Sequence, residues 1–276
     1  MTKNWTILLV LLLASVSQAQ EQPDYRHRWK SLPSLPEPRE QHACEAVNGV
    51  VYTVAGIDGN NVETARSYAF SGDYWRQIAD YPLAVQSCTA EDLDGHLIVT
   101  GGYDHRRFQD GKTRAVYRYS PQTDTWQPLA PMTIAREDHG SAVLAGKLYV
   151  FGGLTNPGHT MADTCEVYDP NTDCWELRPW QCRALGDFAC VVAGEICFPC
   201  GVDTMQGYPL VSGMSYVDAA CVRGEVILIG GCRANIHDPN SLRGAGTAVI
   251  GERLIVTGGW RGRSMDECWE IVPCDN

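Results

Sequence analysis

The chain has 276 residues, of which 44% are hydrophobic and 20% are charged. This composition allows a large core and excludes disorder as the dominant state. The formal net charge is −11, from 22 Lys and Arg against 33 Asp and Glu. So much negative charge argues against nucleic acid or an anionic membrane as a partner, because both repel an acidic protein.

Residues 1–19 have the pattern of a secretory signal peptide. Lys3 gives a positive start, residues 7–14 form an apolar run, and Ser17 and Ala19 place small residues at positions −3 and −1. A membrane anchor is the alternative, but the run is far shorter than the ~20 residues that a spanning helix needs. We therefore expect cleavage after Ala19 and a secreted, extracellular protein of residues 20–276 with no membrane partner.

All 12 cysteines lie after this segment, and in an exported protein we expect most of them to form disulfides. Cys165 and Cys174 flank a predicted hairpin turn and could pair, and Cys268 could pair with Cys274. The connectivity of the remaining cysteines cannot be deduced; six of them crowd one region: Cys182, Cys190, Cys197, Cys200, Cys221 and Cys232.

The spacing Cys197-x-x-Cys200 also occurs in redox and zinc sites. Redox use requires a strand–helix context, and a structural zinc site requires a second ligand pair at suitable spacing. Neither is evident here. We therefore expect no metal site and no cofactor.

An internal repeat organises the rest of the chain. At an offset of 97 residues, Arg39 aligns with Arg136, His42 with His139 and Gly56 with Gly153, with no gap over eighteen positions. A third copy lies between them and ends at the glycine doublet 101–102. Periods of this length indicate a repeat architecture.

The tryptophans follow the same period. They lie 25 or 26 residues before the next doublet or its remnant, at Trp29, Trp75, Trp126 and Trp175. Residues 119–126 and 168–175 share the pattern Tyr-x-Pro-x-Thr-x-x-Trp, and a proline-rich link follows, as in 129–132. Short β-rich runs such as 147–151 end in the doublets.

This combination of a glycine doublet, Tyr-Asp-Pro, Trp, a proline-rich link and Arg-x-x-His resembles the kelch repeat. The resemblance covers nearly all of residues 20–276 and implies an all-β, kelch-type β-propeller. The physical reason is that a four-stranded unit cannot bury both of its faces, so the copies stack in a ring.

The doublets or their remnants end at six positions, Gly56, Gly102, Gly153, Gly201, Gly231 and Gly259, with spacings of 46, 51, 48, 30 and 28. Six full units of roughly 49 residues would exceed the available chain. We therefore predict six blades, of which the fourth and fifth are reduced to their inner strands. A five-bladed or distorted ring, or a transcript that lacks exon-sized pieces, remains a possible alternative.

The two ends of the chain predict how the ring closes. Residues 265–271 match a third strand and stop before a fourth, whereas residues 29–32 match a fourth strand that lacks its first three. We expect these segments to pair, so that no open edge remains.

The loops after the doublets are the candidate binding site, because loops on a rigid scaffold commonly carry function. They hold arginines and aromatics, the composition of interaction hot spots: Tyr103, Arg106, Arg107, Arg233, Trp260, Arg261 and Arg263. If they share one rim, they can bind an acidic protein ligand. The alternative is that these residues are only solvated loop charges.

No catalytic residue is expected. His42 and His139 recur at one repeat position, which favours structural hydrogen bonding, and no Ser-His-Asp order, phosphate loop or HExxH is present in the sequence. Kelch propellers are mostly protein-interaction platforms, and many are fused to ubiquitin-ligase adaptor domains. That adaptor role does not transfer to a chain with a signal segment.

The sequence thus predicts a secreted, monomeric, disulfide-stabilised module that binds proteins or extracellular matrix. The alternative is an exported carbohydrate-active enzyme, since sugar mutarotases and copper radical oxidases also use kelch-like propellers. Fold alone does not decide between the two.

Overall fold

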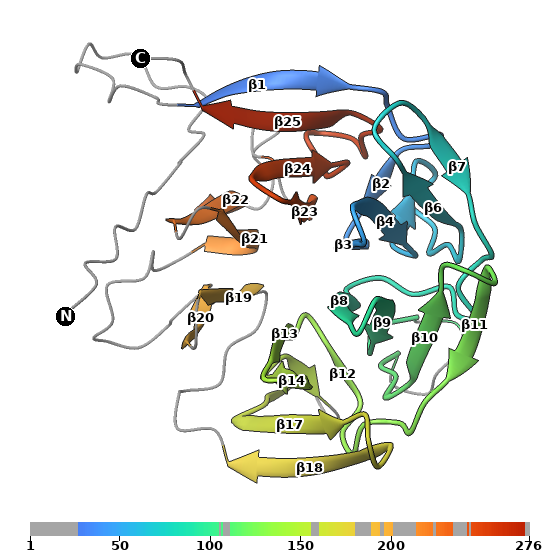
Figure 1. Cartoon of the computed structure of the whole chain (residues 1–276), viewed down its shortest axis with the longest axis vertical. Helices are drawn as coiled ribbons and strands as arrows, with labels where there is room; N and C mark the ends of the chain where they lie inside the picture. Colours follow the sequence, from blue (N-terminus) through green and yellow to red (C-terminus); the bar gives the residue numbers. More distant parts are fainter. Residues whose placement is uncertain are drawn as a thin grey trace.

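The computed structural model describes residues 27–104, 106, 111–155, 160–179, 189–193, 196–200, 214–222, 225–233, 242 and 244–273. Every regular element in this part is a β-strand, and the larger sheets are arranged around one axis (Figure 1). The predicted all-β propeller is confirmed. Across the described ranges, no helix has the length and apolar character needed to cross a membrane.

Three consecutive blades are complete, each an antiparallel sheet ordered from the axis outward. Blade 1 consists of β3 (Ala43–Val47), β4 (Val50–Val54), β6 (Ser67–Phe70) and β7 (Trp75–Gln77). Blade 2 consists of β8 (Thr89–Leu93), β9 (His96–Thr100), β10 (Val116–Ser120) and β11 (Thr125–Pro128). Blade 3 consists of β13 (Gly140–Leu144), β14 (Lys147–Phe151), β17 (Thr164–Asp169) and β18 (Cys174–Pro179).

Two hairpins follow in the ring. Hairpin 4 pairs β19 (Ala189–Ala193) with β20 (Ile196–Cys200), and hairpin 5 pairs β21 (Met214–Val222) with β22 (Glu225–Arg233). These are the inner strands predicted for the two reduced blades. The total of six blades stays a prediction, because residues 180–188, 201–213 and 234–241 lie outside the described part.

The two ends of the chain complete the last blade. Blade 6 consists of β23 (Gly246–Ile250), β24 (Arg253–Thr257), β25 (Cys268–Pro273) and β1 (His27–Leu32). β1 pairs antiparallel with β25, with Trp29 opposite Ile271, so the predicted closure is confirmed. Glu270 on β25 strengthens it, because its buried carboxylate accepts hydrogen bonds from Arg253 on β24 and Lys30 on β1. The predicted signal segment, residues 1–19, lies outside the described residues.

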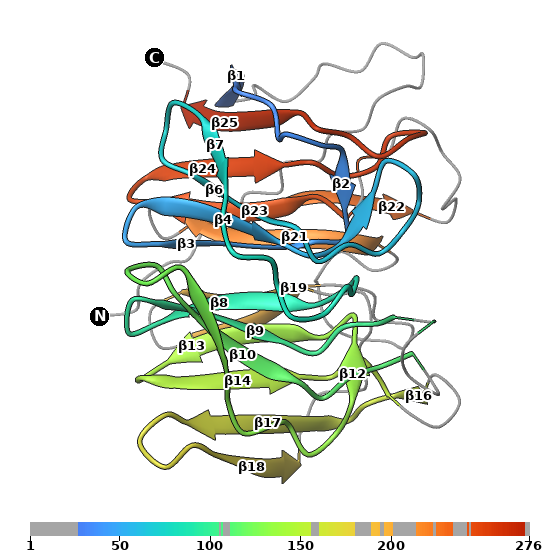
Figure 2. The ribbon, with the colours of Figure 1, turned by 90° about the vertical axis from the view of Figure 1, so that its right-hand side faces the viewer.

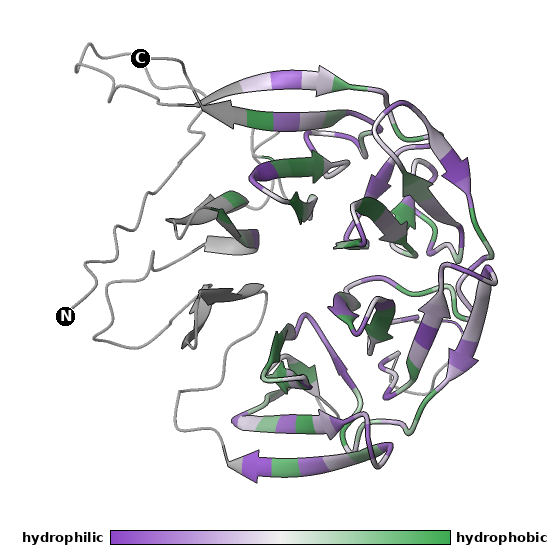
Figure 3. Ribbon diagram, viewed as in Figure 1, coloured by the Kyte–Doolittle hydropathy of each residue, from purple (hydrophilic) through white to green (hydrophobic). Residues whose placement is uncertain are grey.

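The apolar core is divided among the interfaces between neighbouring blades. Val54 of blade 1 packs in one cluster with Leu97 of blade 2, and Ile98 of blade 2 packs in another with Leu148 of blade 3. Inner strands such as β4, β14 and β24 are therefore mostly hydrophobic, whereas the outermost strands β7 and β11 are hydrophilic and β18 mixes both kinds of residue (Figure 3). We call each such interface a seam.

One tryptophan of each complete blade crosses a seam, as the sequence predicts. Trp126 Nε1 donates to the Ala79 carbonyl in the link after blade 1, and Trp175 Nε1 donates to the Ala130 carbonyl after blade 2, both at 2.8 Å. Trp75 Nε1 donates to Pro33 O at 2.9 Å, after blade 6. The indole thus joins its own blade to the link that precedes it.

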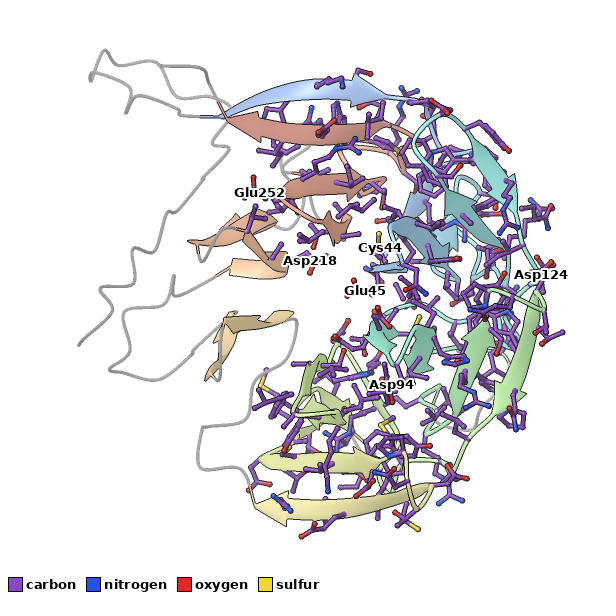
Figure 4. All side chains as sticks on the ribbon, viewed as in Figure 1. Cys44, Glu45, Asp94, Asp124, Asp218 and Glu252 are labelled. Atoms are coloured by element: carbon purple, nitrogen blue, oxygen red, sulfur yellow. The ribbon has the colours of Figure 1, made fainter. Side chains whose placement is uncertain are left out.

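An aspartate fixes the same link from the hairpin turn. Asp124, at the outer edge of the seam (Figure 4), accepts from the Ala79 amide at 2.8 Å and from the Tyr119 hydroxyl at 2.7 Å. Asp173 does the same with the amide of Ala130 and the hydroxyl of Tyr168, both at 2.9 Å. The Tyr-x-Pro-x-Thr-Asp-x-Trp pattern is therefore one seam contact repeated.

The predicted pairing of Cys165 with Cys174 is wrong, and Cys274, the proposed partner of Cys268, lies outside the described residues. Cys165 lies opposite Arg178, whereas Cys174 lies opposite Asp169. The two are thus offset by four positions, roughly 13 Å along a strand, too far for a disulfide. Cys268, the proposed partner of Cys274, is also a free thiol, like Cys44 and Cys88.

We predict that Trp175→Phe lowers the free energy of unfolding by about 1 kcal/mol more than Trp29→Phe does. The first change loses the indole hydrogen bond to Ala130 O, which is worth about 1 kcal/mol net. Trp29 is the matched control: it packs edge-on against Trp269, and its indole has no hydrogen bond within the described ranges. Denaturant unfolding measures both variants, and equal losses would contradict the assignment.

Candidate functional site: the rim

The glycine doublets determine where the candidate loops leave the blades. The amide of the second glycine donates across the seam to a carbonyl of the next blade: Gly56 to Val85 at 2.7 Å, Gly102 to Arg136 at 3.0 Å, and Gly259 to Arg39 at 2.7 Å. The first glycine lies just as close: Gly101 has φ of +63°, and a Cβ there would lie 2.6 Å from Arg136 O of the next blade. Only glycine permits this approach.

Four loops start at these doublets, and we call them together the rim: residues 57–63, 103–112, 154–161 and 260–264. Each closes through an amide that donates to the second glycine of its doublet, from Thr64, Thr113, Ala162 and Met265 at 2.8 to 3.0 Å. Residues 105, 107–110 and 156–159 of the rim lie outside the described part.

Small sheets attach the rim to the blades. β2 (Arg39–Glu40) pairs with β5 (Ile57–Asp58), and β12 (Arg136–Glu137) pairs with β15 (Leu154–Thr155), which pairs with β16 (Thr160–Met161). Figure 2 shows β2, β12 and β16 on the same side of the ring. The rim loops therefore share one face.

A belt of backbone hydrogen bonds borders the rim toward the axis. Gln41, Ser87 and Asp138 have φ near +50° at one repeat position. The Ser87 amide donates to Gln41 O at 2.9 Å and the Asp138 amide donates to Ser87 O at 3.2 Å, while the Gln41 amide donates to Gly244 O at 2.8 Å. The inner border of the rim is thus a fixed frame.

The two repeat arginines belong to this frame. Arg136 is fully buried, donates to Gly152 O at 2.5 Å and pairs with the equally buried Glu166 at 2.8 Å. Arg39 donates to the Ala55 and Arg66 carbonyls and pairs with Glu37. Both arginines therefore have structural partners. Removing one partner of such a buried pair typically costs about 3–5 kcal/mol.

The two repeat histidines are structural as well. His42 Nε2 lies 2.9 Å from Thr257 Oγ1 of blade 6, and His139 Nε2 lies 3.0 Å from Thr100 Oγ1 of blade 2. Burial, and then the neighbouring arginine, lower the pKa of each histidine to about 3. Both are therefore neutral at physiological pH and serve as contacts across the seams, as expected from their repetition.

Two predicted binding residues lie on the blade 2 loop and are already engaged. Tyr103 forms β-bridges with Gln86 and Lys112, and its ring lies 5.8 Å below the Lys112 ammonium. Arg106 pairs with Glu63 of the blade 1 loop at 2.9 Å, although its side chain is 50% exposed. Arg106 thus links two rim loops.

The blade 6 loop carries the most accessible predicted residues. Trp260 bridges Ser264, and the Arg261 amide donates to Arg263 O at 2.9 Å, so the turn is ordered by its own backbone. Arg261 and Arg263 are exposed, and within the described ranges neither guanidinium has a hydrogen bond or ion pair. Arg107, and the side chain of Arg233 at the end of β22, lie outside the described part.

The structure adds two apolar rim residues that the sequence analysis missed. Val62 on the blade 1 loop is 38% exposed and Met161 on β16 is 44% exposed. Lone apolar residues in a loop give no pattern by which to single them out. Their position on the same face of the ring as the exposed arginines becomes visible only in the fold.

Carboxylates facing the ring axis were also missed. Glu45 on β3, Glu91 on β8 and Asp218 on β21 come from three inner strands, and Figure 4 shows Glu45 and Asp218 at the centre of the ring. Burial raises the pKa of Glu91 to about 7, and burial, and then the charge of Glu91, raise the pKa of Glu45 well above its usual range. The 46-residue spacing of the two glutamates is the signal that could have found them.

A hydroxyl from the next blade holds two of these carboxylates. Ser141 Oγ donates to Glu91 at 2.7 Å, and Thr247 Oγ1 donates to Asp218 at 2.9 Å. Beside Glu45, the same repeat position of the next blade is occupied by Ala90, which has no hydroxyl group. Within the described residues, no group of three or more His, Cys, Asp or Glu side chains could hold a metal ion.

Comparison with known proteins agrees with this geometry. The kelch motif matches residues 87–133 and 135–179, which contain blades 2 and 3. Kelch repeat and BTB domain-containing protein 1 of cowpox virus is 27% identical over 166 residues, or 60% of this chain and 28% of the viral protein. Mouse Kelch-like protein 35 is 32% identical over 154 residues, or 55% of this chain and 25% of the mouse protein.

The chain thus spans about a quarter of the length of these relatives. Among solved structures, that of YjhT superposes with a TM-score of 0.73 over 88% of this chain and 99% of YjhT. At 15% identity, this similarity establishes the fold alone. Two kelch motifs and the kelch-type propeller fold are thus established for this chain.

We predict that Ala90→Ser raises the free energy of unfolding by about 1 kcal/mol where Glu45 is ionised, so that the gain increases as pH rises. The new hydroxyl can donate to ionised Glu45 as Ser141 does to Glu91. Because the folded-state pKa of Glu45 is raised, its protonated form favours folding at low pH, and that contribution is lost as pH rises.

Ser141→Ala is the matched control and should destabilise the protein at pH 8 more than at pH 4.5. Thermal unfolding at the two pH values measures both variants. An Ala90→Ser effect that is independent of pH would show that the hydroxyl does not act on Glu45.

Proposed function

We propose that this protein is a secreted kelch propeller that binds a protein segment on its rim, and that the segment is acidic. One observation carries the proposal. Of the four large apolar side chains that are exposed in the described part, two, Val62 and Met161, lie on the rim, the face that also presents Arg261 and Arg263. Methionine and arginine are enriched in protein interfaces.

The charge of the chain supports an acidic ligand. The net charge is −11, so an acidic segment is repelled by most of the surface and attracted only where cations are exposed. An arginine fork can bind a carboxylate through two hydrogen bonds. Arg261 and Arg263 project from an ordered turn, so little backbone entropy is lost when they bind.

The rigid frame supports a binding role in the same way. The belt at Gln41, Ser87 and Asp138 and the glycine bonds hold the bases of the loops, while the loop tips vary from blade to blade. A preorganised scaffold lowers the entropic cost of association.

Secretion is proposed from the pattern of residues 1–19. Disulfide stabilisation is proposed only for the cysteines between residues 182 and 232, because the described pairs do not form. We propose that the protein acts as a monomer in extracellular matrix or secretions.

The test is a comparison of two double variants with equal charge change. Arg261→Ala with Arg263→Ala removes the rim arginines, and Arg76→Ala with Arg178→Ala removes exposed arginines from the outer strands β7 and β18. The probe is a set of fluorescent glutamate-rich peptides with one central leucine or methionine, followed by anisotropy. We expect the rim variant to bind about thirtyfold more weakly, the equivalent of a 2 kcal/mol hot spot.

The outer-strand variant should bind like the wild type, and both should keep the wild-type melting temperature within about 2 °C. Equal binding by the two double variants would show that the rim arginines are only solvated charges. The alternative, an exported carbohydrate-active enzyme, predicts sugar turnover by the purified protein, which the same samples can be assayed for.

A further inference from the structure

One buried residue of each blade packs on the second glycine of the doublet and faces the preceding blade. Its Cβ lies within 3.1 Å of the place that a Cβ on this glycine would take. The structure describes this residue in blades 1, 2, 3 and 6, where it is His42, Cys88, His139 and Ala245. We call it the docking residue of its blade.

Two docking residues are histidines, and each meets a threonine of the preceding blade. His42 Nε2 lies 2.9 Å from Thr257 Oγ1 of blade 6, and His139 Nε2 lies 3.0 Å from Thr100 Oγ1 of blade 2. Both threonines come immediately before a doublet. The buried imidazole therefore has a hydroxyl partner at the same place in both seams.

Both histidine rings also lie against the first glycine of that doublet. A Cβ on Gly101 would be 2.5 Å from Cε1 of His139, and a Cβ on Gly258 would be 3.0 Å from Cε1 of His42. A side chain on either glycine would thus crowd the ring. A histidine at the docking position requires a Thr–Gly pair in the blade before it.

The seam between blades 1 and 2 carries a different set of residues. Its docking residue is Cys88, and blade 1 has Val54 and Ala55 where blades 2 and 6 have Thr and Gly. All three residues are buried in one apolar cluster. Ala55 has φ of +58°, the same as Gly258. Its Cβ therefore takes the space that an imidazole ring takes in the two histidine seams.

The seam between hairpin 5 and blade 6 follows the same rule. Its docking residue is Ala245, and Ile229 of hairpin 5 stands where blades 2 and 6 have Thr. Both residues belong to one apolar cluster. In these four seams, a polar docking residue meets a polar partner and an apolar docking residue meets an apolar partner.

The two sets exclude each other for physical reasons. A histidine docked on blade 1 would collide with the Cβ of Ala55 and leave its Nε2 against the methyl groups of Val54. Overpacking and a buried polar atom without a partner both destabilise a fold. A cysteine docked on a Thr–Gly pair would leave a cavity in place of the ring, which is also destabilising. Each blade therefore fits its own neighbour better than a blade of the other kind.

We propose that the docking residue and the pair it meets form a recognition code between blades, which selects the correct neighbour and so closes the ring within one chain. Selection matters because the repeats resemble one another, and repeat proteins are prone to misassembly and domain swapping. A buried polar contact can specify one arrangement over its competitors. The code belongs to the frame and does not rest on the proposed function of the rim.

Unfolding in denaturant tests the match in the seam between blades 1 and 2. Cys88→His should lower the equilibrium constant for folding about hundredfold, because the ring meets Ala55 and its Nε2 has no partner. Adding Ala55→Gly and Val54→Thr copies the histidine set. This triple variant should return the constant to within about tenfold of wild type.

Cys88→Leu is the matched control, because leucine has comparable bulk but no polar atom. Ala55→Gly should relieve both Cys88 variants, whereas Val54→Thr should improve only the histidine variant, by about tenfold. An equal effect of Val54→Thr on both would overturn the polar match. So would a triple variant that is as unstable as Cys88→His or does not fold.

Refolding tests whether the code selects neighbours. In the triple variant, the seams on both sides of blade 1 and the seam between blades 2 and 3 carry the same set, so blades of two copies can dock in the wrong order. After dilution from denaturant at high protein concentration, light scattering should detect about fivefold more oligomer than in wild type.

Cys88→Ala is the control for the loss of the thiol, since it keeps an apolar docking residue, and it should refold to monomer like the wild type. A triple variant that is stable and refolds to monomer as completely as Cys88→Ala would contradict the proposal. The sets would then stabilise their seams without selecting neighbours.

Discussion

The ring depends on one backbone hydrogen bond that recurs at the seams, from the amide of the second glycine of a doublet to a carbonyl of the next blade. Gly56, Gly102 and Gly259 each make it, at 2.7 to 3.0 Å. It brings two backbones so close that a Cβ on Gly101, the first glycine of the blade 2 doublet, would lie 2.6 Å from Arg136 O of the next blade. Around it, the same seams hold the indole contacts, the aspartate contacts and the neutral histidines. The blades are thus joined by backbone and buried polar contacts, with apolar layers between them.

The seam contacts form a structural frame that is distinct from the proposed binding face. Groups that recur at one repeat position, such as Arg39 and Arg136, are buried and have structural partners. Residues that do not recur, such as Met161 and Arg261, are exposed on the rim. A repeat protein can vary these loops without disturbing its seams, because each blade contacts only its neighbours. The proposed binding rests on positions where one blade departs from the others.

Much of this frame could be predicted from the sequence, because the glycine doublets and tryptophans of the repeat recur at regular spacings. The offset of 97 residues located the doublets, the tryptophans and the structural role of His42. The unmatched end strands predicted that residues 29–32 pair with the last blade. Strand register was harder. Cys165 and Cys174 flank one turn, yet a shift of four positions separates them, and the sequence does not show that shift. The axis carboxylates were missed for a similar reason: the sequence does not show which side chains the ring brings together at its axis.

Amide hydrogen exchange of the doublet glycines, measured residue by residue in NMR spectra, tests the central claim most directly. If the bonds from Gly56, Gly102 and Gly259 hold the ring, their amides exchange only when the whole ring unfolds. Their opening free energies should then equal the global free energy of unfolding, while exposed rim amides such as that of Arg263 exchange far faster. Exchange of the three glycine amides at the rate of the rim loops would contradict the account.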